Sequence, residues 1–181
     1  MCVFSVALAF ALVDWISPPN LLHPRLTSWA VTERRLVVVD RTGDPGWQHA
    51  VAEASLSWDQ AGAGIGLTAN ADSGPCRYER ALIELCQVPF AVLASSNVPD
   101  IQGMTKTDLH GDIIRGAVIE VCSDCDLSAD RRLVIVTHEL GHALGLVHSL
   151  DPTSMMYPVG GPDRPSAADN AVLRKLYPPQ R

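Results

Sequence analysis

Apolar residues along this chain alternate between short continuous runs and stretches in which they recur at helical spacing. The runs predict strands at residues 35–40, 65–68, 81–88, 102–109 and 113–121. The helical spacing predicts helices at residues 47–61, 133–144 and 166–176, the last two with Ser128 and Ser166 as capping residues. His110-Gly111-Asp112, between the last two strands, is typical of a hairpin. The pattern predicts a folded unit that combines strands and helices.

The first residues of the chain have a different character. Cys2 to Val13 is almost wholly apolar and too short to cross a bilayer as a helix. The run resembles the apolar part of a secretory leader, with Ala9 and Ala11 as a cleavage signal, although no Lys or Arg precedes it. A buried N-terminal strand or helix is the alternative. We expect residues 1–30 to hold a leader and N-terminal segment, and residues 31–181 to form one domain.

The length of the chain and its net charge limit the kinds of partner that we expect. A chain of 181 residues suits a single compact domain, which we expect to be a monomer. The net charge of −6 and the absence of a basic cluster argue against nucleic acid as a partner. No apolar run is long enough to predict a membrane span.

The cysteines favour export. Loss of a leader that contains Cys2 would leave an even number, suited to two disulfides in a secreted protein. These four are Cys76, Cys86, Cys122 and Cys125. The local pairing joins Cys76 to Cys86 and Cys122 to Cys125, but the spacing does not settle it. Cys122 and Cys125 also have the spacing of a redox pair or of half a zinc site.

The most informative segment runs from His138 to His148. On a helix, His138 and His142 project from one face, close enough to share a metal ion, and Glu139 points about 100° away. A continued helix would carry His148 roughly 9 Å along its axis and off that face. Gly145 is the residue able to end the helix and turn the chain back. The alternative is an ordinary amphipathic helix whose histidines are satisfied by core hydrogen bonds.

This arrangement of side chains predicts hydrolytic chemistry. Three neutral imidazoles leave a zinc ion its double charge and one open position, where water has a pKa of about 7. Glu139 would accept the proton of that water as it attacks a carbonyl, and would return a proton to the departing amine.

A second segment supports a family resemblance. Met156 follows His148 by eight residues, with Tyr157 and Pro158 directly after it. Together with the histidine motif, and with Ser149 after the third histidine, this resembles the metzincin metalloproteases of the matrixin type. The resemblance implies a hydrophobic methionine floor, here Met156, beneath the zinc ligands. It also implies an α+β fold.

In this fold, a mixed twisted sheet of about five strands and three main helices flank an active-site cleft between an N-terminal subdomain and a small C-terminal one. Residues 31–181 would be the catalytic domain. The strand at 102–109 would be the exposed edge to which a protein or peptide substrate adds by main-chain hydrogen bonds. Gly103, Met104 and Thr105 would then line the cleft, together with Tyr157 and Pro158.

The chain departs from matrixins in places. Val159-Gly160 follows Pro158 where matrixins often have a second tyrosine that helps to form the specificity pocket, so the side-chain preference is open. A cysteine-switch propeptide and the loop that supplies structural zinc and calcium ligands are not recognisable. Structural calcium is therefore unsupported. We expect the aspartates that could bind calcium to be solvated carboxylates or helix caps instead. These aspartates are Asp108, Asp112, Asp124, Asp126 and Asp130.

The principal hypothesis is a secreted zinc endopeptidase with one catalytic zinc ion, ligated by His138, His142 and His148. A non-catalytic zinc-binding interaction module of the same fold is the alternative from another class. A zinc hydrolase of a non-protein amide is a third. The presence of Glu139 favours catalysis over a degenerate binding module, and only the cleft would separate the two hydrolases. The physiological substrate and the activation route are not readable from these residues.

Overall fold

The computed structural model describes residues 27–30, 32–96, 101–159 and 161–178. The six strands form one sheet in the order β1-β6-β4-β2-β3, with β5 also paired to β6. The pairs within that path are parallel, and β5 is antiparallel to β6. The strands are β1 (Ser28–Trp29), β2 (Arg35–Asp40), β3 (Gly66–Ala71), β4 (Leu82–Val88), β5 (Gly103–His110) and β6 (Ile113–Cys122). The expected mixed sheet is confirmed.

Four helices accompany the sheet, and their starts follow local capping chemistry. They are α1 (Pro45–Asp59), α2 (Phe90–Ala94), α3 (Ala129–Ala143) and α4 (Ala167–Leu176). α1 begins two residues before the predicted start, because Asp44 accepts a hydrogen bond from the Gly46 amide and Pro45 fits the first helical turn. Ser128 caps α3 and Ser166 caps α4, as predicted.

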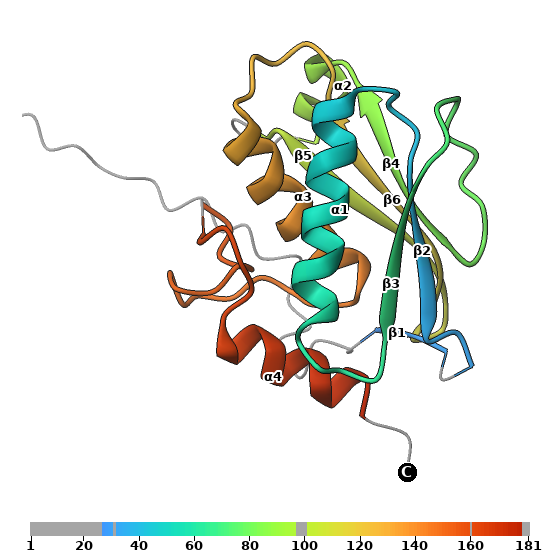
Figure 1. The fold of residues 1–181 in the computed structure, drawn as a ribbon, viewed down its shortest axis with the longest axis vertical. Helices are drawn as coiled ribbons and strands as arrows, with labels where there is room; N and C mark the ends of the chain where they lie inside the picture. Colours follow the sequence, from blue (N-terminus) through green and yellow to red (C-terminus); the bar gives the residue numbers. More distant parts are fainter. Residues whose placement is uncertain (1–26, 31, 97–100, 160, 179–181) are drawn as a thin grey trace, which may run out of the picture.

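The hydrophobic core lies between the sheet and the two long helices. α1 and α3 lie on the same side of the sheet, as Figure 1 shows. Ile83, Leu85 and Ile119 on the strands and Trp58 and Leu140 on the helices are fully buried in this core. The Trp58 indole donates a hydrogen bond of 2.8 Å to the Thr137 carbonyl, which links α1 to the middle of α3. Burial of this apolar face holds α3 against the sheet.

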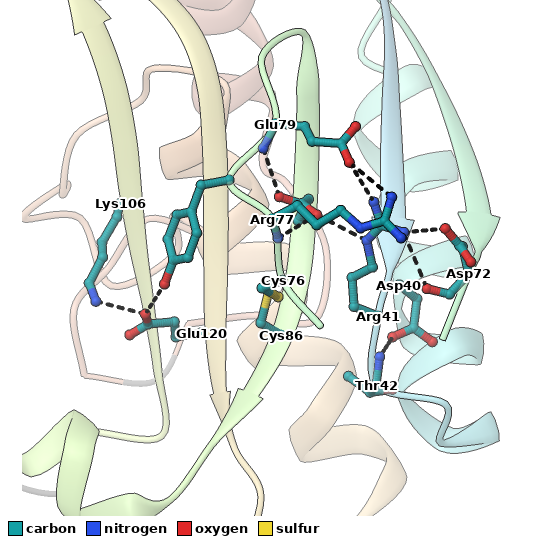
Figure 2. Close-up of a disulfide and its surroundings, with 12 residues drawn as sticks. Asp40, Arg41, Thr42, Asp72, Cys76, Arg77, Glu79, Cys86, Lys106 and Glu120 are labelled. Atoms are coloured by element: carbon teal, nitrogen blue, oxygen red, sulfur yellow. Dashed lines mark hydrogen bonds and ion pairs between the residues drawn. A yellow bond between two sulfur atoms is a disulfide. The ribbon is translucent and has the colours of Figure 1, made fainter. Parts of the chain in front are cut away.

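The loop of residues 72–81 packs over β4 and β6 on the opposite face of the sheet. Strand residues alternate in direction, so Glu84 on β4 points away from the core although it is fully buried. Its carboxylate accepts hydrogen bonds from the Arg41 guanidinium at 2.9 Å and from the Glu79 amide at 3.0 Å (Figure 2). Burial alone would raise the pKa of Glu84, but these hydrogen bonds hold it below its ordinary value.

Two disulfides form, with the local pairing. Cys76 bonds Cys86 and ties the 72–81 loop to β4, beside the Arg41 ion pairs (Figure 2). Cys122 bonds Cys125 in the turn between β6 and α3. A disulfide between residues ten positions apart, as in Cys76–Cys86, stabilises a fold by about 2–4 kcal/mol, chiefly by restricting the unfolded state.

The sequence pattern did not predict β1 or α2, and the expected leader lies outside the described residues. β1 has only two residues and α2 only five, too few for a periodic signal. The predicted leader, residues 2–13, is not among the described residues. β1 falls within residues 1–30, and Trp29 is 2% exposed in the core. In the part of the chain that is described, no helix has the length and apolarity to cross a membrane.

Candidate active site

The C-terminal end of α3 turns the chain back at Gly145. The helix ends at Ala143, and Gly145 has a φ of +93°. The Gly145 amide donates to the His142 carbonyl at 2.9 Å, and the Leu146 amide to the Gly141 carbonyl at 3.0 Å. This left-handed turn ends the helix between the second and third histidines, as the spacing predicted.

Both ends of the described chain hold this turn in place. Tyr177, after α4, donates from its hydroxyl to the Leu144 carbonyl at 2.8 Å and accepts from the Trp29 amide at 3.1 Å. The Trp29 indole donates to the Ala143 carbonyl at 2.9 Å. A Cβ at Gly145 would overlap the Thr27 carbonyl oxygen. The last carbonyls of α3 are thus satisfied by residues distant in sequence.

The turn brings His138, His142 and His148 together. The Nε2 atom of His148 lies 3.3 Å from that of His138 and 3.1 Å from that of His142. The Nδ1 atoms of His138 and His142 each lie 2.8 Å from a carbonyl oxygen, of Met155 and Leu146 respectively. A carbonyl only accepts, so these Nδ1 atoms carry hydrogen, and the Nε2 lone pairs converge on one point.

This donor set fits a zinc ion. Nitrogen ligands at zinc distances in a tetrahedral site are about 3.3 Å apart, close to the separations here. Converging lone pairs repel each other without a cation between them. The carbonyls that orient the rings are the kind of partner that metal-bound histidines have in proteins.

Burial keeps the histidines neutral. It lowers the pKa of His142 to about 4, despite the hydrogen bond to the Leu146 carbonyl. It also lowers the pKa values of His138 and His148. Neutral imidazole is the form that binds metal, so the ligands are ready at neutral pH.

Glu139 lies beside the histidines but is turned toward the sheet. The residue is 8% exposed, and its Oε2 atom accepts a hydrogen bond of 2.7 Å from the Thr105 hydroxyl on β5. Burial raises the pKa of Glu139, against the lowering effects of His138 and the Thr105 hydrogen bond. A buried carboxylate with a raised pKa next to such a histidine cluster is suited to proton transfer.

Met156 lies beneath the α3 segment that carries the ligands. It is 1% exposed, and a Cβ on Gly141 would overlap its sulfur atom and come within 2.9 Å of Trp58. Gly141 therefore allows Met156 to approach the helix backbone between His138 and His142. Met156 is thus packed against the part of α3 from which His138 and His142 project.

Asp169 of α4 holds the turn around Met156. It is 4% exposed, and its carboxylate accepts from the Ser154 hydroxyl, from the Met155 amide at 2.9 Å and from the Ser166 amide at 2.8 Å. The Met155 carbonyl in turn orients His138. The cap of α4 and the carbonyl that orients His138 thus depend on one carboxylate.

The expected cleft residues are divided between two segments. Gly103, Met104 and Thr105 open β5, which pairs with β6 alone among the described strands. Tyr157 is half-buried and Pro158 is exposed after the Met156 turn. The Tyr157 amide donates to the Ser154 carbonyl at 3.1 Å.

Sequence reasoning missed four supporting residues. Asp169 had a local signal, because Ser166 and Asp169 have the spacing of a capping box. Gly141 lies inside the histidine motif, but its need for a missing Cβ depends on Met156. Trp29 and Tyr177 had no signal, since their contacts join residues up to 148 positions apart.

A second metal site has little support in the described residues. Asp124 lies with Cys122 and Cys125, but the two cysteines are bonded to each other and offer no thiolate. The Asp124 carboxylate accepts from the Phe90 amide at 2.7 Å, which is a capping role. Asp108 lies 3.8 Å from Arg80. Neither aspartate points to calcium.

Comparisons with known proteins agree with this geometry. The family model of the matrixins matches residues 79–178. Human matrilysin is 46% identical over 50 residues, which are 25% of this chain and 19% of that protein. Cat matrilysin is 66% identical over 29 residues, 16% of this chain and 11% of that protein. The matched stretches thus span less than a fifth of these curated relatives.

The solved structure of myroilysin is similar in fold. It superposes with a TM-score of 0.53 at 15% sequence identity, covering 86% of this chain and 97% of that one. The family match extends over more than half of the chain and includes the histidines, Glu139 and Met156. The chain therefore belongs to the matrixin family of peptidases.

Proposed function

We propose that this chain is a zinc-dependent endopeptidase, with His138, His142 and His148 as the zinc ligands and Glu139 as the general base. The observation that carries the proposal is the convergence of three Nε2 atoms beside a buried carboxylate. Membership of the matrixin family supports the reaction class.

The residues would divide the chemistry among them. A zinc ion held by the three histidines would supply Lewis-acid polarisation of the scissile carbonyl and would make a water molecule easier to deprotonate. Glu139 takes a proton from the attacking water and returns a proton to the leaving amine. The Met155 and Leu146 carbonyls hold the rings of His138 and His142 in the ligating orientation.

The substrate in this proposal is an extended protein or peptide segment. Strand β5 pairs with β6 along one edge, and its other edge is unpaired among the described strands. Thr105 on this strand hydrogen-bonds Glu139, so the strand lies beside the site. An extended peptide can add to such an edge by main-chain hydrogen bonds. Tyr157 and Pro158 would then form the opposite wall.

We also propose that the protein acts outside the cell and that its catalytic unit includes Trp29, before the expected start at residue 31, as well as Tyr177. Two disulfides suit an oxidising compartment. Trp29 and Tyr177 belong to the packing of the α3 end, so the unit needs both.

The test compares wild type with Glu139→Gln. Purified wild type should contain about one zinc ion per chain, cleave an unfolded generic protein at internal bonds and lose activity with a zinc chelator. Glu139→Gln should keep its zinc and lose activity by at least about a thousandfold. Asp163→Ala, an exposed residue of the loop before α4, is the control and should behave as wild type.

Three outcomes would overturn the proposal. Full activity of Glu139→Gln removes the general base. Zinc binding without cleavage of any protein substrate identifies the non-catalytic binding module instead. Cleavage of a purified non-protein amide polymer, with unfolded protein left intact, identifies the other hydrolase.

A further inference from the structure

The first residues of β5 contact Glu139 rather than facing only the substrate. The Thr105 hydroxyl oxygen lies 2.7 Å from Glu139 Oε2 and 2.8 Å from the Glu139 carbonyl oxygen. Gly103, two residues earlier on the same strand face, leaves room for the same side chain. A Cβ there would come within 3.1 Å of Glu139 Cγ and 2.6 Å of an Ile135 methyl carbon.

We propose that Gly103 and Thr105 form a seat that fixes the Glu139 carboxylate, and that Thr105 is a positioning residue for the general base. The proposal rests on the proposed function, because it concerns the orientation of Glu139 during peptide hydrolysis. Gly103 contributes by its missing side chain, and Thr105 by a hydrogen bond at the carboxylate oxygen.

The Thr105 hydroxyl suits both forms that Glu139 takes in a catalytic cycle. One hydroxyl has a single hydrogen and two lone pairs. When Glu139 is a carboxylate, the hydroxyl donates to Oε2. When Glu139 carries the proton, the hydroxyl accepts from it and donates to the Glu139 carbonyl, 2.8 Å away. The contact is kept in both forms, so the side chain need not turn between the two proton transfers.

The need for such a seat follows from burial. Glu139 is 8% exposed, so an unpaired carboxylate there would be costly and would turn toward any donor within reach. In the part of the chain that the structure describes, Thr105 is the side chain that donates a hydrogen bond to it. Misplacement of a catalytic group by about 1 Å costs on the order of a hundredfold in rate.

The seat also joins substrate position to base position. The strand whose free edge would hold the peptide main chain is the strand that orients Glu139. A shift of β5 along α3 would move both together. Thr105 is thus a link between the cleft edge and the base, instead of a residue that selects substrate side chains.

The experiment replaces the hydroxyl while keeping the side-chain shape. Thr105→Val should lower kcat about ten- to a hundredfold, with KM within about threefold of wild type and with zinc content unchanged. Thr105→Ser should restore kcat to within about threefold of wild type. Thr68→Val, an exposed site on β3 away from the proposed substrate edge, is the matched control and should leave both constants unchanged. Thr105→Ala replaces Thr105→Val if the latter does not fold.

A double mutant separates positioning from general structure. If Thr105 acts through Glu139, then Thr105→Val should cause no further loss in a Glu139→Gln background, because the oriented base is already gone. An additive loss, or a loss confined to KM, would overturn the proposal. So would wild-type kcat in Thr105→Val while Glu139→Gln is inactive, a result that leaves the proposed function intact.

A crystal structure of Thr105→Val gives a readout that does not depend on activity. The Glu139 carboxylate should leave its wild-type position or occupy more than one rotamer, while the three histidines stay in place. An unchanged, single Glu139 conformer would refute the seat, whether or not the wild-type protein cleaves peptides.

Discussion

Replacement of Asp169 by alanine should damage both the fold and the proposed zinc site, although the groups that its carboxylate bonds belong to a turn and a helix cap. Its carboxylate accepts hydrogen bonds from three donors: the Met155 amide, the Ser166 amide and the Ser154 hydroxyl. The first and third lie in the turn that precedes Met156, and the second begins the cap of α4. Alanine at this position leaves all three donors without their acceptor.

The size of the effect follows from burial. A hydrogen bond to a charged group contributes about 1.5–3 kcal/mol, and removing one partner of a buried bond costs more than removing both. Asp169 is 4% exposed, so water does not replace it readily. We expect Asp169→Ala to lower the free energy of unfolding by about 3–5 kcal/mol, since the three contributions are not independent. A domain stable by 5–15 kcal/mol would still fold in the absence of denaturant.

The effect on zinc is predicted separately. The Met155 carbonyl orients His138, and the Met155 amide is the group that Asp169 holds. Loss of a group that orients a metal ligand typically costs about 10- to 100-fold in metal affinity. Asp169→Asn, which keeps the shape and one acceptor oxygen, should show a smaller loss in both properties.

The assays are urea unfolding of the zinc-free domain and competition for zinc with a calibrated chelator dye. Asp163→Ala, in the exposed loop before α4, is the control for loss of a carboxylate nearby. An Asp169→Ala protein within about 1 kcal/mol of wild type would refute the reasoning. Wild-type zinc affinity in a variant whose stability has fallen would also refute it, because Asp169 would then not act on His138 through Met155.

Three further predictions concern other parts of the molecule. Gly145→Ala should lose at least about 1 kcal/mol of stability, because its φ of +93° disfavours a side chain and the new Cβ overlaps the Thr27 carbonyl; a wild-type urea midpoint would contradict this. The zinc-free domain should lose stability as the pH falls from 6.5 toward 4. His142 has a pKa lowered to about 4, so the unfolded chain takes up a proton that the folded one refuses. The resulting loss in the free energy of unfolding is about 3 kcal/mol at its largest. His142→Asn should make stability depend less steeply on pH. Replacing Cys76 and Cys86 by serine should lower the free energy of unfolding by about 2–4 kcal/mol; equal midpoints for variant and wild type in urea would disprove a stabilising role.

The grouping of the three histidines was the most predictable part, because the information for it is local in the sequence. Two histidines four apart on a helix share a face, and a glycine three residues after the second permits the turn that returns the third. Gly145 indeed has a positive φ, and the three Nε2 atoms converge. Strand and helix positions were also predictable, since apolar periodicity reports which face is buried.

The groups that orient the site were less predictable, because their roles arise from tertiary contacts. Thr105 was expected at the cleft rim, yet its hydroxyl bonds Glu139, which depends on how β5 lies against α3. Trp29 lies in a two-residue strand with no periodic signal. The need for glycine at position 141 arises from Met156 and Trp58, which pack against it from elsewhere in the chain.

The contact of Trp29 and Tyr177 at the end of α3 has a consequence for synthesis of the protein. Their hydrogen bond joins residues 148 positions apart, and both side chains hold the last carbonyls of α3. A ribosome makes Tyr177 well after the histidines, so Tyr177 cannot secure the turn at Gly145 until α4 has left the ribosome. A nascent chain that already contains His138, His142 and His148 therefore lacks the completed site. The three histidines reach their final arrangement only once α4 has formed and has docked against the end of α3.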